Sequence, residues 1–293
     1  MSAGPLVFDR ALLRRRQSRA RALGFETFLL DRAASDLADR LGAVLREFGI
    51  AIDLGTPTDA VRTSLASVAS VGALFRVTAS PGANIIADEE ALPFGDGSLD
   101  LVISALALQF VNDLPGTLVQ IRRALKLDGL FLAALLGGDT LTELRQSFAA
   151  AEVEVEGGVS PRVAPFADVR EMGSLLQRAG FALPVTDVER LTVRYSSPFI
   201  LMGELRRMGA TNVLIERRRT PLRRATLKRM AEIYARRFSD RDGKVRATFE
   251  IIWLSGWAPH ESQQKPLAPG SARRRLADAL GTKETRLPRN GDR

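Results

Sequence analysis

The chain has 293 residues, of which 45% are hydrophobic, and it contains no cysteine. Without cysteine it can form no disulfide, thiolate metal site or cysteine nucleophile, and no apolar run reaches the roughly 20 residues of a membrane-spanning helix. Its 42 basic and 34 acidic side chains leave a net charge of +8, which favours acidic partners. The composition predicts a globular protein with a full hydrophobic core and no transmembrane segment.

The first predicted element is rich in arginine. Six arginines lie between residues 10 and 21, interleaved with leucine and alanine. This composition is typical of an organellar transit peptide and also of a folded amphipathic helix. We favour the folded helix, because the stretch continues without a spacer into residues 25–48, whose apolar positions follow a helical spacing that stops at Gly49. Residues 1–48 are therefore predicted to form an N-terminal helical segment.

Alternating strands and helices follow. Continuous apolar runs predict strands, and amphipathic stretches between them predict helices. The predicted strands cover residues 50–54, 73–78, 83–87, 99–105 and 129–136, and the predicted helices cover residues 58–71 and 114–124. This alternation indicates a mostly parallel sheet that helices cover on both faces, with ligands at the carboxyl ends of the strands.

The pattern changes after Gly137. The predicted helices are now at residues 169–179, 199–208 and 222–238, and the predicted strands are at residues 191–195 and 245–254. A strand, a helical excursion and a returning strand indicate an antiparallel edge pair with a helical cap inserted at about residues 196–243. The sequence thus predicts an α/β fold with a doubly wound, mostly parallel, seven-stranded sheet in residues 49–260. A mostly irregular, basic tail follows at 261–293.

Charge is distributed unevenly along the chain. The basic cap, from Arg206 to Arg246, holds 14 basic and 4 acidic side chains, a surplus of 10, whereas residues 25–205 hold 14 basic and 24 acidic side chains, a deficit of 10. The basic cap therefore favours an acidic protein surface, a phosphate backbone or peripheral contact with an anionic membrane, and its alternative is a solvated helix face. Few aromatic residues separate the arginines, which argues against stacking on nucleic-acid bases and favours a protein partner.

The turn after the first predicted strand carries a ligand-binding motif in altered form. Residues 50–60 place Asp53 and Gly55 after an apolar strand, and this resembles the first motif of class I methyltransferases, which depend on S-adenosylmethionine (SAM). In the family pattern Asp-x-Gly-x-Gly-x-Gly, the glycines bring the backbone close to the cofactor. Here Pro57, which has no N–H, and Asp59 replace the later glycines. The resemblance implies SAM as cofactor, with binding that is weakened or lost.

Three further stretches resemble the middle of the same methyltransferases: residues 88–94, 98–104 and 108–113. The resemblance implies that Asp88, with Glu89 beside it, accepts a hydrogen bond from the adenine amino group. It also implies that the backbone from Ser104 to Leu106 lies along the methionine part of SAM. The alternative for Asp88 is a plain turn or helix cap. The acid that normally holds the ribose is missing, since residues 79–82 read Ala-Ser-Pro-Gly.

Nearly the whole chain resembles one branch of that superfamily, the methyltransferase-like assembly factors of respiratory NADH:quinone oxidoreductase (complex I), found in mitochondria and related bacteria. The matching stretches are residues 8–10, 14–17, 157–162, 256–263 and 269–272. The resemblance implies modification of a complex I subunit during assembly, and arginine hydroxylation is described for the mitochondrial members. It implies a cytoplasmic protein in a bacterium and a mitochondrial matrix protein in a eukaryote.

Few side chains suggest a reaction by themselves. His260 is the single histidine, so a two-histidine, one-carboxylate iron site cannot form from this chain, and a structural role is favoured over that of a general base. Glu152, Glu154 and Glu156 alternate along the chain, and an extended segment would align them as a clamp for a guanidinium group. A solvated acidic face is the alternative. The catalytic candidates are therefore His260, Glu154 and Glu156.

Three classes of function stay open, and the sequence does not decide whether the protein is an enzyme. The first is an enzyme that modifies a protein during complex I assembly, by SAM-dependent methyl transfer or arginine hydroxylation. The second is a non-catalytic assembly factor with a degenerate SAM pocket, which the altered motif supports. The third is a nucleic-acid methyltransferase, which only the basic cap supports.

Overall fold

The computed structural model describes residues 6–264, 277–278 and 281–282. The chain divides after Pro259, and the fold lies in the unit that precedes this point. Most of the tail predicted at 261–293, including the matching stretch at 269–272, lies outside the described residues. Among the described residues, no helix combines the length and the apolar character needed to cross a bilayer.

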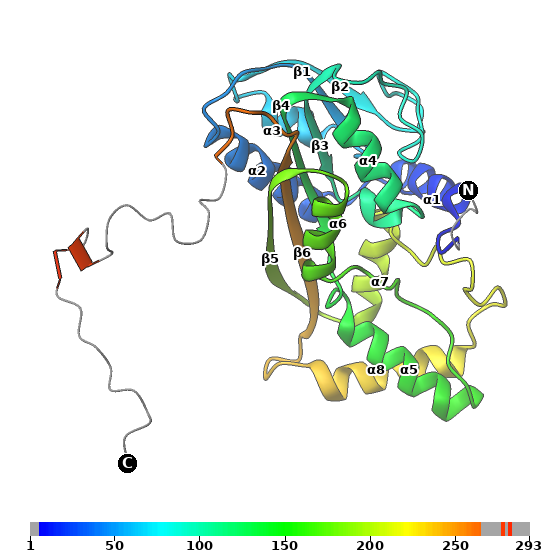
Figure 1. Cartoon of the computed structure of the whole chain (residues 1–293). Helices are drawn as coiled ribbons and strands as arrows, with labels where there is room; N and C mark the ends of the chain where they lie inside the picture. Colours follow the sequence, from blue (N-terminus) through cyan, green and yellow to red (C-terminus); the bar gives the residue numbers. More distant parts are fainter. Residues whose placement is uncertain (1–5, 265–276, 279–280, 283–293) are drawn as a thin grey trace. The chain divides into compact units, whose positions relative to one another are not determined.

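The elements alternate as the sequence pattern predicts (Figure 1). The strands are β1 (Phe48–Leu54), β2 (Val71–Val77), β3 (Leu99–Ala105), β4 (Leu125–Leu136), β5 (Ala182–Tyr195) and β6 (Val245–Trp257). The helices are α1 (Arg10–Ala22), α2 (Phe28–Gly42), α3 (Ala60–Leu65), η1 (Leu108–Phe110, one 3₁₀ turn), α4 (Leu114–Ala124), α5 (Thr142–Glu156), α6 (Val169–Arg178), α7 (Pro198–Arg207) and α8 (Arg224–Phe238).

The strands form one six-stranded sheet in the order β2-β1-β3-β4-β6-β5. Neighbours among β1 to β4 are parallel, and β6 pairs antiparallel with both β4 and β5. The α/β class and the mostly parallel sheet are confirmed, but the sheet has six strands instead of seven. The predicted strand at 83–87 forms only one bridge, between Ile85 and Val77, because the amides of Asn84 and Ile85 both donate to the carbonyl of Arg76.

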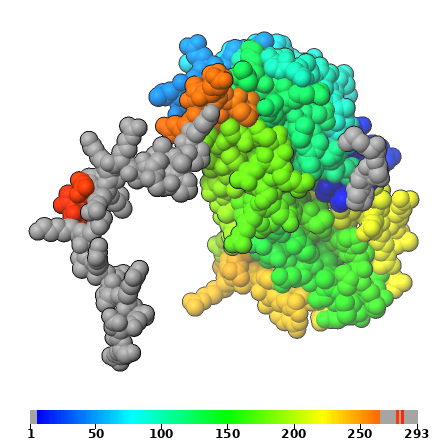
Figure 2. Space-filling view, in the orientation of Figure 1, coloured from blue at the N-terminus to red at the C-terminus, as the bar shows by residue number. Residues whose placement is uncertain are grey.

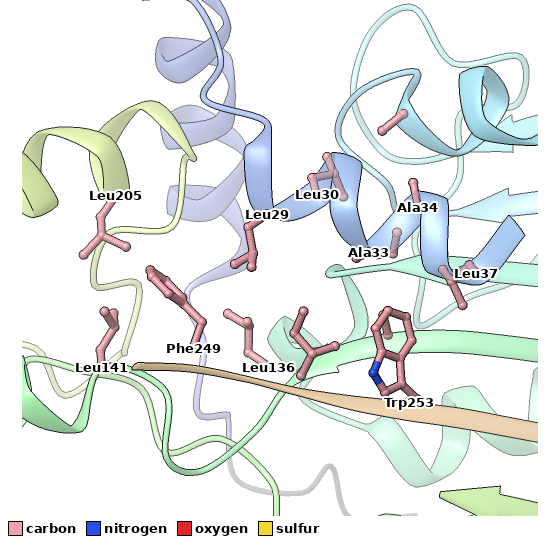
Figure 3. Close-up of a cluster of buried hydrophobic side chains, with 14 of the residues drawn as sticks. Leu29, Leu30, Ala33, Ala34, Leu37, Leu136, Leu141, Leu205, Phe249 and Trp253 are labelled. Atoms are coloured by element: carbon pink, nitrogen blue, oxygen red, sulfur yellow. The ribbon is translucent and has the colours of Figure 1, made fainter. Parts of the chain in front are cut away.

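Helices cover both faces of the sheet, and the central strands β3 and β4 are accordingly buried along nearly their whole apolar runs. One buried cluster joins α2, α3, α5, α7 and α8 to the sheet, and the other joins α4 and α6 to the opposite face. Figure 3 shows the first cluster, in which Leu29, Ala33 and Leu37 of α2 face Leu136 and Trp253 of the sheet. The carboxyl ends of β1, β3 and β4 therefore meet beneath these helices.

The helices α7 and α8 lie in the sequence between the antiparallel strands β5 and β6. The α8 helix packs along α5, and α1 contacts α7 (Figure 1). The connection between the cap helices, at residues 209–223, runs beside the N-terminal segment, where Phe8 bridges to Leu214 (Figure 2). The cap therefore contacts the N-terminal segment at two places, through α7 and through the connection that precedes α8.

Three local predictions differ from the structure. The helix predicted at 58–71 is shorter, because α3 ends at Leu65. The strand predicted at 129–136 is longer, because β4 begins at Leu125. It passes through Asp128, which takes a positive φ of 63° and whose amide donates to the carbonyl of Ala258. The α5 helix was missed, because the alternating Glu-Val-Glu-Val-Glu sequence at its end suggests a strand.

Candidate functional site

A cavity lies where the strand order changes direction, at the carboxyl ends of β1 and β3. This central cavity has a volume of about 70 Å³. Pro57 after β1, Leu106 after β3 and Leu136 at the end of β4 contribute to its wall. Such a switch point is where doubly wound α/β proteins bind their ligands.

An outer cavity of about 210 Å³ adjoins the central one and extends toward the cap, past Met202 and Leu222. The two cavities share five wall residues: Phe110, Leu141, Phe166, Leu205 and Ala210. Figure 3 shows how Leu141, Leu205 and Phe249 point toward one another at the central cavity. An apolar cavity of about 150 Å³ already binds benzene, so the outer cavity has room for a side chain.

Four polar side chains line the central cavity, namely Gln17, Glu26, Gln109 and Thr140, and the rest of its wall is largely apolar. Glu26 and Gln109 among them offer acceptor oxygens. Gln109 donates through Nε2 to the carbonyl of Leu106 at 2.7 Å, which leaves Oε1 buried without a partner. Glu26 pairs with Arg207 through its carboxylate, and its backbone amide donates to the carbonyl of the same arginine. The cavity thus combines apolar walls with two acceptors, an arrangement that orients a ligand with an apolar stem and a donor head.

A third, polar cavity of only about 20 Å³ lies at the ends of β1 and β2, where the sequence predicts the adenosine part of SAM. Two α1 arginines fill this end. Arg10 pairs with Asp88, Glu89 and Glu90, and Arg14 pairs with Asp88. The Arg10 side chain is only 13% exposed, whereas Arg14 and Asp88 are 41% and 34% exposed, so water reaches the outer part of the cluster.

The charge cluster shifts the ionisation of its acids in opposite directions. Burial tends to raise the pKa of Asp88, but the Glu90 amide and the Arg10 and Arg14 guanidinium groups bring that pKa below its ordinary value. The more deeply buried Glu89 has a raised pKa, because burial outweighs the attraction of Arg10. Asp88 therefore stays ionised as the partner of α1, and its predicted contact with adenine stays a prediction.

The altered first motif keeps the backbone shape of the family. Gly55 has a φ of +80°, and a Cβ there would lie 2.8 Å from the Ala107 Cβ and 3.1 Å from the Glu89 Cγ. Only glycine fits this position. Asp53 is fully buried, and burial raises its pKa to about 7, although the Thr56 hydroxyl lowers it in part. The hydroxyl does not reach hydrogen-bonding geometry, so both Asp53 oxygens lack a partner.

The two remaining predicted cofactor residues differ in their surroundings. Ser104 is buried, and its hydroxyl donates to the carbonyl of Leu54 at 2.8 Å, which ties β3 to β1. Leu106 has a φ of +50° and lines the central cavity. Strain of this kind concentrates at functional sites, because the surrounding structure must hold it in place.

In this arrangement the residues at the strand ends do not fit SAM. Pockets for ligands of that size occupy about 300–1,000 Å³, whereas the polar cavity is filled by Arg10 and Glu89. Pro57 offers no amide, and Ser80 stands where an acid would hold the ribose. The polar end of the site therefore binds α1 through ion pairs instead of presenting a cofactor pocket.

The expected alignment of Glu152, Glu154 and Glu156 is wrong, because these residues lie on the helix α5, where alternate positions diverge. Glu152 is 1% exposed and accepts hydrogen bonds from Ser160 and Arg162, so it fixes the following loop. The carboxylate of Glu154 binds Arg229 of the cap, which lowers the pKa of Glu154. The pKa of Glu156 is lowered by hydrogen bonds from the Thr226 hydroxyl and from Arg218, both in the cap. None of the three lines the central or outer cavity.

His260 belongs to the second unit of the chain, which begins at this residue. Its Nδ1 lies 2.7 Å from the Ser262 hydroxyl, and the Ser262 amide donates to the same nitrogen at 3.2 Å. These are local turn contacts. Its role as a general base stays a prediction.

Several arginines of the basic cap form ion pairs within the chain, so they are not free to bind a partner. Arg217 pairs with Asp9 at 3.0 Å, Arg218 pairs with Glu156, and Arg229 pairs with Glu154. These pairs fasten the cap to α1 and α5. By contrast Arg219, in the same arginine run, is exposed and has no ion pair with any described residue.

This difference predicts unequal effects of charge reversal within one run of arginines. Arg217→Glu should lower the free energy of unfolding by about 2 kcal/mol, because it leaves Asp9 beside a like charge at a half-buried contact. The matched change Arg219→Glu should stay within about 0.5 kcal/mol of the parent protein. Urea unfolding of both variants measures the two values, and equal effects would contradict the fastening role of Arg217.

Sequence reasoning missed Glu26, Gln109, Arg10 and Arg14 as site residues. Arg10 and Arg14 are four residues apart, so they share one face of α1, and this spacing opposite the acidic run 88–90 is a signal that could have paired them. No comparable signal marks Glu26 and Gln109, since only the folded chain brings α2 and η1 to the same cavity.

Comparison with known proteins agrees with this geometry. Residues 52–133 match the family model of a methyltransferase domain. Two solved structures, a methyltransferase-type protein of Bacillus halodurans and the YcgJ protein of Bacillus subtilis, share the fold with a TM-score of 0.51 at 15% identity. They cover 77% and 78% of this chain, and 99% of each of those chains is matched.

Much closer relatives exist among curated proteins. The chain is 38% identical over 289 residues to the mitochondrial arginine-hydroxylase NDUFAF5 of Danio rerio, with 94% of this chain and 90% of that protein covered. It is 39% identical over 281 residues to the protein of that name in Homo sapiens, with 91% and 81% covered. Similarity at this level over nearly the whole length identifies the family: the chain belongs to the NDUFAF5 arginine-hydroxylase family.

Proposed function

We propose that this protein hydroxylates an arginine side chain of a protein partner during the assembly of respiratory complex I. Support comes from the name arginine-hydroxylase, which the relatives at 38–39% identity carry. Further support comes from a site that suits arginine better than it suits SAM. The reaction takes place in the cytoplasm if the source is a bacterium, and in the mitochondrial matrix if it is a eukaryote.

The observation that carries this proposal is the pair of acceptors, Glu26 and Gln109, in the central cavity, which the outer cavity joins through shared apolar wall residues. Arginine has an apolar stem and a planar head with five N–H donors. The outer cavity can hold the stem against Phe166 and Leu205, and the head then reaches Gln109 and Glu26 in the central cavity. The unpartnered Oε1 of Gln109 gains a donor, which removes the cost of leaving it buried and unsatisfied.

The role of these side chains is to bind and orient the arginine and to exclude water from it. Hydroxylation inserts one atom of dioxygen into a C–H bond, and the other atom leaves as water with two protons and two electrons from an external donor. The apolar wall shields the stem carbons from bulk water. Glu26 and Gln109 fix the guanidinium group, which leaves the stem carbons free to react.

A non-catalytic assembly factor is the second candidate, and a specific observation favours it. Arg10 and Glu89 fill the end of the site where the fold family holds its cofactor. A protein of this kind would bind the same arginine without changing it. The two candidates predict the same contacts at Glu26 and Gln109 but different products.

The test is mass spectrometry of complex I subunits from cells in which the gene for this chain is deleted and then restored. The parent gene should restore an arginine that carries one additional oxygen atom. Glu26→Gln and Gln109→Leu should reduce the modified fraction at least about tenfold, since a lost charge-assisted hydrogen bond costs about 1.5–3 kcal/mol. Glu171→Gln, at an exposed acid on α6 that lines none of these cavities, is the matched control and should restore full modification. Normal complex I assembly with no modified arginine would establish the non-catalytic alternative.

A further inference from the structure

An open trough of about 510 Å³ lies between the N-terminal turn of α7 and the exposed side of α8, away from the central cavity. Its apolar floor consists of Pro198, Phe199, Leu227, Ala231, Ala235 and Val245. Phe199, which lines the trough, is 49% exposed, and Leu227 and Ala231 beside it are only partly buried. Large apolar side chains left uncovered side by side mark an interaction surface.

The shape of this α7–α8 trough suits a helix. The α8 residues that line it, from Arg224 through Leu227 and Ala231 to Ala235, recur every three to four positions and therefore form one straight stripe. Ala231 and Ala235 are small, so the backbone of a partner can approach closely. At about 1.5 Å per residue the stripe is about 16 Å long, which matches three turns of helix.

The charge around the trough determines the kind of helix. Residues 223–246 hold nine basic and three acidic side chains, a surplus of six. Arg224 and Lys228 lie on the trough wall, and both are exposed. Glu232 is the acidic wall residue, and it is held by Arg229 at 3.1 Å and by Lys228 at 4.0 Å. Carboxylates beside the apolar face of a partner helix can therefore pair with Arg224 and Lys228.

We propose that the α7–α8 trough binds an acidic amphipathic helix of a protein partner. Apolar anchors at positions i, i+3, i+4 and i+7 of that helix pack on Phe199 and Ala231, and flanking carboxylates pair with Arg224 and Lys228. The recessed floor favours a helix over a flat bilayer surface. Phe199 is the single aromatic residue of the wall, which gives nucleic-acid bases no stacking platform. The trough is independent of the cavities that carry the proposed reaction.

Fluorescence anisotropy with a designed peptide tests this surface in the full chain. The probe is a labelled helix of about three turns with leucine at i, i+3, i+4 and i+7 and glutamate elsewhere. A second probe has lysine in place of every glutamate. The acidic probe should bind, with an affinity that falls as salt rises. Its dissociation constant should rise at least tenfold in Phe199→Asp and in Lys228→Glu.

Matched controls separate this trough from a general charge or hydrophobic effect. Ile86→Asp removes an apolar side chain that is 72% exposed elsewhere, and Arg170→Glu reverses an exposed charge on α6. Neither change should alter the dissociation constant of the acidic probe. All four variants should have the melting temperature of the parent protein. If Phe199→Asp does not fold, the result with Lys228→Glu decides the test. Equal binding of the lysine probe, or unchanged binding by Lys228→Glu, would overturn the proposal. So would displacement of the peptide by vesicles of phosphatidylcholine and phosphatidylserine at equal salt.

Discussion

Replacing Arg10 with methionine should lower the free energy of unfolding by about 3 kcal/mol, because the change leaves buried acids without their cation. Arg10 is largely buried and pairs with Asp88, Glu89 and Glu90 at once, so it holds α1 against the ends of β1 and β2. Methionine keeps the apolar stem, so most of the loss is electrostatic. Arg19→Met is the control on the same helix, since Arg19 is exposed and has no ion pair with a described residue, and its effect should stay within about 0.5 kcal/mol.

The same ion pairs control access to the polar end of the site. Calorimetry of the parent protein with SAM and S-adenosylhomocysteine should give no measurable heat of binding, because α1 fills the place of the cofactor. Any binding that appears in Arg10→Met should be lost again when Asp88→Ala is added, since Asp88 is the acid of the intact motif. A micromolar or tighter dissociation constant for the parent protein, unaffected by Asp88→Ala, would show that SAM binds without displacing α1.

The core of the fold was predictable because its signals are local. The strand β3 and the helix α4 begin and end where the sequence predicts. A continuous apolar run specifies β3, and α4 starts at a capping Asp113 whose carboxylate accepts from the Gly116 amide. The helix α5 has a weaker signal, because the alternation of glutamate and valine in its last turns competes with the helical spacing of Leu144, Phe148 and Ala151.

The candidate site was less predictable because it depends on contacts between distant segments. Arg10 and Asp88 are 78 residues apart, and Glu26 meets Arg207 across 181 residues. The motif around Asp53 and Gly55 correctly located the turn, but by itself it does not show that α1 lies there, because the arginines of α1 and the acids at 88–90 are far apart in the sequence. Only the folded chain reveals that the missing glycines coincide with a helix that fills the polar end of the site.

Asp53→Asn should remove a pH dependence that the buried carboxyl group imposes on stability. The folded-state pKa of Asp53 is about 7, above its ordinary value of 3.8. A raised carboxyl pKa means that the folded state holds the proton more tightly than the unfolded state. Stability therefore falls as pH rises from about 4 to about 7, and the full penalty remains above that range. Below pH 4 both states are protonated, and the group contributes nothing.

The size of this effect follows from the two pKa values. Between pH 5 and pH 8 the parent protein should lose about 2.5 kcal/mol of stability relative to Asp53→Asn, at about 1.36 kcal/mol per pKa unit. The introduced asparagine places a buried amide without partners, so the absolute stability of the variant is a poor guide and the change with pH is the informative quantity. Asp53→Ala removes the same titrating group without adding an amide, and it should show the same change. Urea unfolding at several pH values gives the free energy of unfolding of each protein. If this free energy changes with pH equally in the parent and in both variants, Asp53 has a partner in solution. If the stability difference changes with pH as expected, the acid of the altered first motif is a buried carboxyl group that is about half protonated at pH 7.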